Sequence, residues 1–180
     1  MKLSRNFYQK TKPRIHRRIV HELRCAQRVV DIGCGGCDLD ELLAKWPGRQ
    51  VVGVDISSAA FPSKRKRGRH PRCVRADARA LRFIKTNSVD AVVSVWSLHE
   101  MSAPMAVLRE ARRVLRPCGE ILIVDFPRGS LAQRLWDERF YTTGRVAQML
   151  RRAGFVRVEA RRIARKQLTW ARGFKPPIGN

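Results

Sequence analysis

The sequence predicts an α/β fold: a Rossmann-like, seven-stranded, mostly parallel sheet with an antiparallel C-terminal hairpin and helices on both faces. Short apolar runs alternate along the chain with segments whose apolar residues recur at helical spacing, and this alternation is typical of a parallel sheet covered on both faces. Near the C-terminus, two strand-like segments are separated by only a short basic turn, which predicts an antiparallel pair. The length of 180 residues and the hydrophobic content of 44% suit one globular domain.

The first half of the chain contains three predicted strands and the helices between them. A capping box of Asp38 and Glu41 begins the second helix. Proline and glycine residues within 57–72 reduce the third helix to a short piece and a solvated loop. In chain order, the predicted elements are a helix over 14–24, a strand over 28–32, a helix over 38–46, a strand over 51–55, a shortened helix within 57–72 and a weak strand over 73–76.

The second half begins with the strand that is predicted most strongly. Residues 89–95 are mostly Val and Ala, Pro104 lies in the first turn of the helix that follows, and Gly154 closes the last helix. In chain order, the predicted elements are a strand over 89–95, a helix over 102–115, a strand over 120–126, helices over 131–136 and 146–153, and the hairpin strands over 155–163 and 168–174.

The chain is strongly basic, with 38 Lys and Arg against 15 Asp and Glu and a net charge of +23. No apolar stretch reaches the roughly 18 residues of a membrane span, and the N-terminus lacks the features of a signal peptide. We therefore expect a cytoplasmic protein. The basic run Lys64–Arg72 and the arginines near the C-terminus attract polyanions, which makes nucleic acid a candidate partner. A solvated, arginine-rich surface without such a partner is the alternative.

The cysteines do not have the pattern of a disulfide framework. Five of them, an odd number, occur in a chain without a signal peptide: Cys25, Cys34, Cys37, Cys73 and Cys118. Cys34 and Cys37 make a C-x-x-C pair, which is the pattern of a redox centre or of half a zinc site. The sequence shows no second C-x-x-C or Cys/His pair to complete such a site, so we expect no metal.

The most informative segment is the glycine loop over 33–36, between a predicted strand and a predicted helix. Its glycines allow a tight turn and let the backbone approach a ligand at the helix N-terminus. Asp55 ends the second strand, where a carboxylate can accept hydrogen bonds from both ribose hydroxyls of an adenosine. Asp77 lies just beyond the third strand, within reach of an adenine amino group. The pattern predicts a site for an adenosine-containing ligand.

These motifs belong to a longer pattern that resembles the class I S-adenosylmethionine-dependent methyltransferases, most of all the ubiquinone/menaquinone-biosynthesis-type group. The matching segments are 31–35, 54–57, 76–78, 88–94, 108–120 and 153–155, in the family's order. The resemblance implies methyl transfer, with S-adenosylmethionine as cofactor and S-adenosylhomocysteine as product. It leaves the acceptor open: the family favours a small molecule, and the charge makes RNA the alternative.

The resemblance also assigns roles to residues. The Gly33–Gly35 backbone would cradle the methionine part, Asp31 would hold its amino group, and Asp55 would bind the ribose. Ile56 would pack on the adenine, and Asp77 with the Ala78 amide would read the base edge. The full set of cofactor-binding residues is Asp31, Gly33, Cys34, Gly35, Asp55, Ile56, Asp77, Ala78 and Ser94.

Catalysis of methyl transfer requires mainly alignment and the exclusion of water, so a dedicated catalytic residue is not essential. His99 lies in the loop after the fourth strand and is the best candidate for a general base; a histidine that only shapes the pocket wall is the alternative. Residues 1–27 are expected to form a basic helical segment that serves as a lid, with His16 exposed. Residues 28–180 are expected to form the methyltransferase domain.

Overall fold

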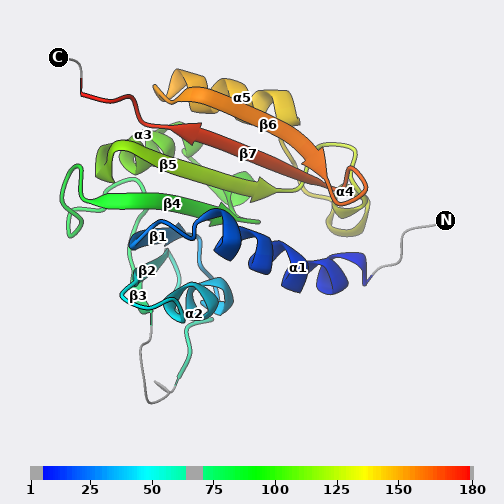
Figure 1. The fold of residues 1–180 in the computed structure, drawn as a ribbon. Coiled ribbons are helices and arrows are strands. Elements are labelled where there is room, and N and C mark those ends of the chain that lie inside the picture. The colour runs from blue at the N-terminus through cyan, green and yellow to red at the C-terminus, as the bar shows by residue number, and fades with distance from the viewer. Residues whose placement is uncertain (1–5, 64–70, 179–180) are drawn as a thin grey trace.

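The centre of the computed structural model is a seven-stranded sheet in the order β3-β2-β1-β4-β5-β7-β6 (Figure 1). The structure describes residues 6–63 and 71–178, so most of the predicted basic run lies outside the described residues. All pairs from β3 through β5 are parallel, whereas β7 is antiparallel to β5 and to β6. The predicted sheet and its C-terminal hairpin are confirmed.

The elements follow the predicted order. They are α1 (Phe7–Glu22), β1 (Arg28–Ile32), α2 (Asp38–Ala44), β2 (Gln50–Asp55), β3 (Arg72–Arg75), β4 (Val89–Val95), the 3-10 helix η1 (Leu98–Glu100), α3 (Pro104–Val114), β5 (Leu115–Asp125), α4 (Leu131–Trp136), α5 (Thr143–Arg152), β6 (Val156–Ile163) and β7 (Leu168–Phe174). No helix in the described part of the chain is long and apolar enough to span a membrane.

Local predictions fail at four places. β5 begins at Leu115, directly after α3 and five residues before the predicted start of the strand at residue 120. α1 begins at Phe7 and continues through Pro13, well before the predicted start at residue 14. The described residues between β2 and β3 contain no helix. The expected capping box is also wrong: Cys37 is the N-cap of α2, and Asp38 instead accepts a hydrogen bond of 2.5 Å from Lys12 Nζ.

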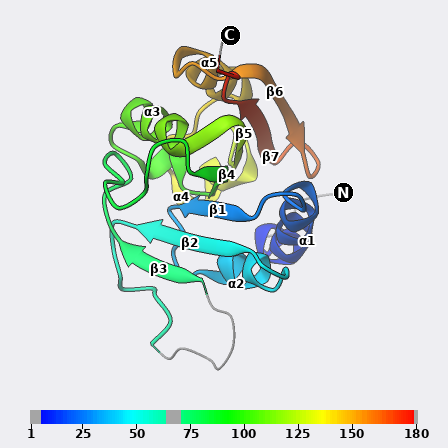
Figure 2. The ribbon, with the colours of Figure 1, turned by 60° about the vertical axis from the view of Figure 1, so that its left-hand side comes forward.

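The sheet divides the core into two layers, because successive residues of a strand point to opposite faces. Val30, Val92 and Ile123 pack with α3 and α5 on one face. Val29, Val93 and their neighbours pack with α1, α2 and α4 on the other face. Figure 2 shows these helices on the two sides of the sheet. The central strands are therefore buried on both sides, which accounts for their near-continuous apolar sequences.

Gly53 in β2 lets the side chains of Asp40 in α2 and Cys34 in the glycine loop approach this strand closely. A Cβ atom there would collide with Asp40 Oδ2 and lie 2.9 Å from Cys34 Sγ. We expect Gly53→Ala to lower the free energy of unfolding by about 1–3 kcal/mol, the usual cost of overpacking. Urea denaturation measures the change.

Gly144→Ala is the matched control, because a methyl group at Gly144 in α5 meets no atom within 4 Å. This substitution should raise the free energy of unfolding by about 0.4–1 kcal/mol through loss of backbone freedom in the unfolded chain. Equal effects of the two substitutions would contradict the crowding at Gly53.

Candidate functional site

A cavity of about 560 Å³ opens where β1, β2 and β4 end. The strand order reverses between β1 and β4, and open α/β sheets bind their ligands at such a reversal. The volume is within the range of about 300–1,000 Å³ that small-ligand sites occupy. The wall includes most of the residues predicted to bind the cofactor: Asp31, Gly33, Cys34, Gly35, Asp55, Ile56, Asp77 and Ala78.

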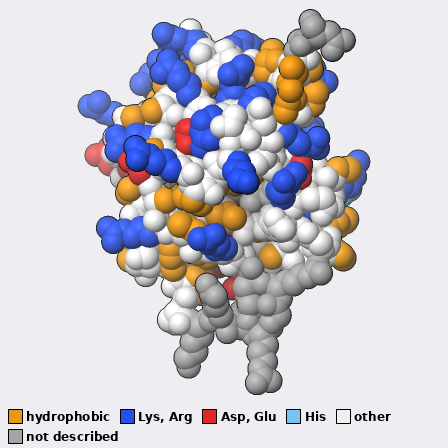
Figure 3. Space-filling view, turned by 90° about the vertical axis from the view of Figure 1, so that its left-hand side faces the viewer, with side chains coloured by type: hydrophobic (Ala, Val, Ile, Leu, Met, Phe, Trp, Pro, Cys, Tyr) orange, Lys and Arg blue, Asp and Glu red, His pale blue; other side chains and the backbone are white. Residues whose placement is uncertain are grey.

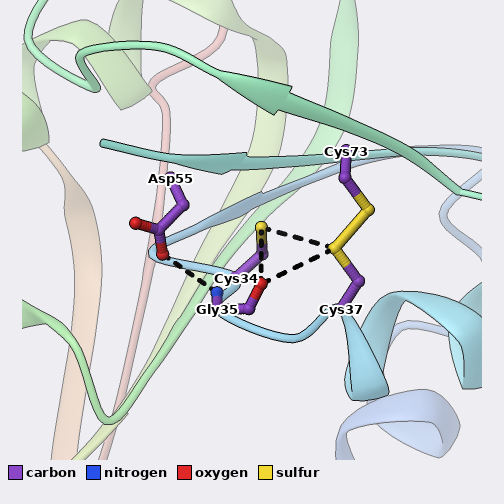
Figure 4. Close-up of a disulfide and its surroundings, with 5 residues drawn as sticks. All are labelled: Cys34, Gly35, Cys37, Asp55 and Cys73. Carbon is purple, nitrogen blue, oxygen red and sulfur yellow. Dashed lines mark hydrogen bonds between the residues drawn. A yellow bond between two sulfur atoms is a disulfide. The ribbon is translucent and has the colours of Figure 1, made fainter. Parts of the chain in front are cut away.

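The glycine loop is held on the end of β2 by hydrogen bonds. The backbone N–H groups of Gly33 and Cys34 donate to the Val54 carbonyl, at 2.7 and 3.2 Å. The Gly35 N–H donates to Asp55 Oδ2 at 2.9 Å, as Figure 4 shows. Gly33 has φ +75° and Gly35 has φ +50°, conformations that glycine adopts without strain. The loop is thus fixed before any ligand binds.

Asp55 and Ile56 lie together at the edge of the cavity. Asp55 Oδ1 accepts a hydrogen bond of 3.0 Å from the Ser57 N–H, so both carboxylate oxygens are oriented by the backbone. Ile56 is 68% exposed, unusual for so apolar a side chain. An exposed apolar side chain beside an oriented carboxylate suits a nucleoside, which has a flat base and a polar ribose.

Asp77 is at the same edge, and its carboxylate is already engaged. Arg79 donates to both of its oxygens, at distances down to 2.6 Å. These hydrogen bonds and the charge of Arg79 lower the pKa of Asp77, which is therefore ionised at neutral pH. The neighbouring Ala78 also lines the cavity.

Asp31 brings a buried carboxylate to the cavity wall. Its side chain is 3% exposed, and Oδ1 has no hydrogen-bond partner among the described residues. Burial raises the pKa of Asp31 well above its ordinary value, and the charges of Asp40 and Asp55 raise it further. A buried acceptor that lacks a partner at a cavity wall is suited to a donor from the ligand, such as an ammonium group.

Ser94 is the one predicted cofactor residue that does not line the cavity. Its hydroxyl lies 2.8 Å from the Ser97 hydroxyl, which donates to the Ile32 carbonyl at 2.9 Å. Ser97 is in the wall. Ser94 therefore lies one layer behind the surface that a ligand would meet.

His99 also lies behind the wall rather than in it. Its side chain is 4% exposed, with Nδ1 2.7 Å from Asp125 Oδ1 and Nε2 3.1 Å from Glu138 Oε2. Burial alone would lower the pKa of His99, but Asp125, Glu100 and Glu138 raise it above the ordinary value overall. The adjacent Glu100 does line the cavity. The role of His99 as a base stays a prediction.

Two wall residues that the sequence analysis did not select come from α1. Lys12 and His16 both line the cavity, and they are four residues apart, on one side of the helix. Their four-residue spacing was the sequence signal that could have selected them. The expectation that His16 is exposed is wrong, since it is 5% exposed. Burial, aided by the charge of Lys12, lowers its pKa to about 4.

One pair of cysteines differs from the prediction that the cysteines form no disulfide framework. Cys37 and Cys73 form a disulfide, although they are 36 residues apart (Figure 4). The β2–β3 pairing brings them together, because Cys73 is opposite Gly53, next to the loop that begins α2. Within the described chain, two groups of potential metal ligands have atoms within 4.8 Å of one another: Cys34, Cys37 and Asp40, and His99, Glu100 and Glu138.

Residues 30–123 match the family described as "Methyltransferase domain". The chain belongs to this methyltransferase domain family. The predicted class, the S-adenosylmethionine-dependent methyltransferases, is thereby confirmed, and the acceptor remains a separate question.

The chain is also similar to individual proteins of known name. The chain is 29% identical to the ubiquinone/menaquinone biosynthesis C-methyltransferase UbiE of Nitrosospira multiformis, over 87% of this chain and 78% of that protein. It is 31% identical to the mitochondrial arginine-hydroxylase NDUFAF5 of Danio rerio, over 59% of this chain but only 33% of that protein. The [4+2]-cyclase SpnF has the same fold, with a TM-score of 0.77, 20% identity and coverage of 94% and 84%. Because two of these proteins are named for other reactions, the fold alone does not establish the reaction.

The two buried histidines predict opposite pH effects on stability. Between pH 6.5 and about 4, unfolded His16 binds a proton that the folded protein does not accept, so the free energy of unfolding falls as the pH falls. Over this window the wild type should lose about 2–3 kcal/mol more than His16→Gln. Urea denaturation at a series of pH values measures the difference.

His99 provides the comparison of opposite sign. Its pKa is raised on folding, so its stabilising contribution is complete below its unfolded pKa and is lost as the pH rises through its folded pKa. The destabilisation caused by His99→Gln should therefore be larger at pH 6 than at pH 9. A destabilisation that does not depend on pH would show that His99 contributes through packing alone.

Proposed function

We propose that this chain transfers the methyl group of S-adenosylmethionine to a small, planar acceptor that binds beside Trp96. The observation that carries the proposal is the single cavity wall that joins the glycine loop with Asp31, Asp55 and Ile56. When bound, the cofactor supplies an electrophilic methyl group on a sulfonium leaving group. The work left to the protein is binding, orientation and exclusion of water.

Each part of the cofactor has a suitable group in the wall. Asp31 offers an unpartnered oxygen to the ammonium group, and Asp55 offers oriented oxygens to the ribose hydroxyls. Ile56 offers an apolar surface to the base. The buried carboxylates also favour a cationic ligand over a neutral one.

Trp96 supports the choice of a planar acceptor. Its indole is in the cavity wall and stacks on Phe126, with ring centroids 5.4 Å apart. Its buried Nε1–H has no hydrogen-bond partner among the described residues. The aromatic face of Trp96 suits a flat ring. The relative from Nitrosospira multiformis, which matches 87% of this chain, is named for the biosynthesis of ubiquinone and menaquinone, whose quinones are such rings.

Glu100 and His99 can accept a proton if the acceptor must lose one. Glu100 lines the cavity, and its Oε1 lies 3.7 Å from His99 Nε2. Asp125 holds the opposite side of the imidazole. Burial raises the pKa of Glu100 above its ordinary value, although the nearby His99 lowers it, so Glu100 is the group in the wall that can take a proton from the acceptor.

Asp55→Ala tests the cofactor assignment. The loss of hydrogen bonds to a charged group should cost about 1.5–3 kcal/mol, an affinity loss of about 10- to 150-fold for S-adenosylmethionine. Isothermal titration calorimetry measures this affinity. Glu159→Ala, on the exposed edge strand β6, is the control and should bind normally. Unchanged affinity in Asp55→Ala would contradict the assignment.

RNA is the second candidate acceptor, because basic side chains dominate the surface. Figure 3 shows many Lys and Arg and few Asp and Glu on one face. Further arginines are exposed near the C-terminus, namely Arg151, Arg152, Arg157, Arg161, Arg162 and Arg165. Such a surface binds phosphates through release of counterions.

Labelled S-adenosylmethionine distinguishes the two acceptors. With the proposed function, label from the methyl group enters small quinols or phenols and not purified RNA. If RNA is the acceptor, label enters RNA, and replacement of Lys64, Arg65, Lys66 and Arg67 by Ser lowers the RNA affinity. The logarithmic salt slope then falls by about 0.7 for each lost contact, while the cofactor affinity stays unchanged.

A further inference from the structure

Three cysteines lie close together where the glycine loop meets α2, and one of them, Cys34, also lines the cofactor cavity. Cys34 belongs to the loop, Cys37 caps α2, and Cys73 lies on β3. The sulfur of Cys37 lies 3.7 Å from that of Cys34 and is joined to that of Cys73 (Figure 4). Cysteines from three separate elements thus point to one place.

A buried carboxylate points to the same place. Asp40 in α2 is 0% exposed, and apart from the carboxyl group of Asp31, no group of the described residues donates a hydrogen bond to its oxygens. Its carboxylate lies with the sulfurs of Cys34 and Cys37 in a group whose ligand atoms are all within 4.8 Å of one another. In the described part of the chain, no Lys or Arg forms an ion pair with Asp40.

Gly53 provides the space for this cluster. A side chain at this position would collide with Asp40 Oδ2 and press on Cys34 Sγ at 2.9 Å. Gly53 is also the residue of β2 that pairs with Cys73 on β3. The absence of a side chain at Gly53 therefore lets the Cys34 sulfur of the loop and the Asp40 carboxylate of α2 approach one another.

We propose that Cys34, Cys37, Cys73 and Asp40 form a four-ligand zinc site. A buried carboxylate without a partner is costly unless a proton or a cation neutralises it. Thiolates select soft or borderline metal ions, and Zn²⁺ takes four ligands of the sulfur, nitrogen and carboxylate types in a tetrahedron. All four ligands come from the protein, which makes the site structural rather than catalytic.

The disulfide and the metal site are two states of the same sulfurs. A dithiol reductant gives two electrons and two protons to the Cys37–Cys73 bond, yielding two thiols, and becomes a disulfide itself. The three thiols release their protons when they bind Zn²⁺. The metal then links the glycine loop and α2 to β3, as the disulfide does in the oxidised state.

The proposed zinc site differs from the expectation that the chain holds no metal. The sequence shows only Cys34 and Cys37 in a ligand spacing, because the other two ligands are brought in by the fold. Asp40 is three residues after Cys37 on the first turn of α2, and Cys73 comes from the edge strand.

The test measures metal content and does not depend on methyl transfer. The full chain is produced with zinc in the medium, purified with a dithiol reductant and dialysed against metal-free buffer. Elemental analysis should find about one zinc per chain in the wild type. Cys73→Ser and Asp40→Asn should bind zinc at least about 10-fold more weakly, whereas Cys25→Ser and Cys118→Ser, at exposed free cysteines, should match the wild type.

Cobalt substitution of the wild type gives a second measurement that does not depend on variants. Co²⁺ in the reduced protein should show thiolate-to-metal charge-transfer bands and the intense visible bands of a tetrahedral site. Reduced wild-type protein that holds no zinc and gives no such spectrum would overturn the proposal. Full zinc affinity in Cys73→Ser or Asp40→Asn would overturn the ligand assignment.

Discussion

The attachment of the glycine loop to the end of β2 is the interaction on which the rest of the site depends. Two loop amides share the Val54 carbonyl, and a third binds the carboxylate of Asp55. The register of β1 with β2, in which Ile32 pairs with Val54, places these groups opposite one another. A shift of one residue would turn Asp31 and Asp55 to the wrong faces and separate the loop from its support. The geometry of the cavity is therefore a consequence of strand pairing.

The charge of the site is opposite to that of the whole protein. The chain has a net charge of +23, yet Asp31, Asp40 and Asp55 gather around one loop. Burial raises the pKa of Asp31, so this carboxylate in the cavity wall favours a cation or a proton. S-adenosylmethionine has a sulfonium and an ammonium group, and its demethylated product lacks the sulfonium charge. The acidic wall thus favours the substrate form of the cofactor over the product form.

Sequence patterns predicted the order of the elements and eight residues of the cavity wall, because both depend on local signals. Strand ends and glycine positions in a parallel sheet determine which side chains meet at its carboxyl edge, as with Gly33 and Asp55. Contacts between distant segments were not predictable in the same way. The Cys37–Cys73 pair depends on the pairing of β2 with β3. The burial of His16 depends on how α1 packs, and its sequence spacing alone does not reveal this.

The packing of α1 limits how the N-terminal segment can act on the cavity. Its side chains Tyr8, Ile15 and Ile19 are 0–5% exposed, and the Tyr8 hydroxyl accepts a hydrogen bond of 2.8 Å from the Ala132 N–H in α4. Lifting the helix as a rigid lid would expose these three side chains, at about 1.5–3 kcal/mol for each. The total approaches the free energy of unfolding of a typical domain, about 5–15 kcal/mol. Lifting the whole helix is therefore costly, whereas the bond between Lys12 and Asp38 lies at the surface and breaks at little cost.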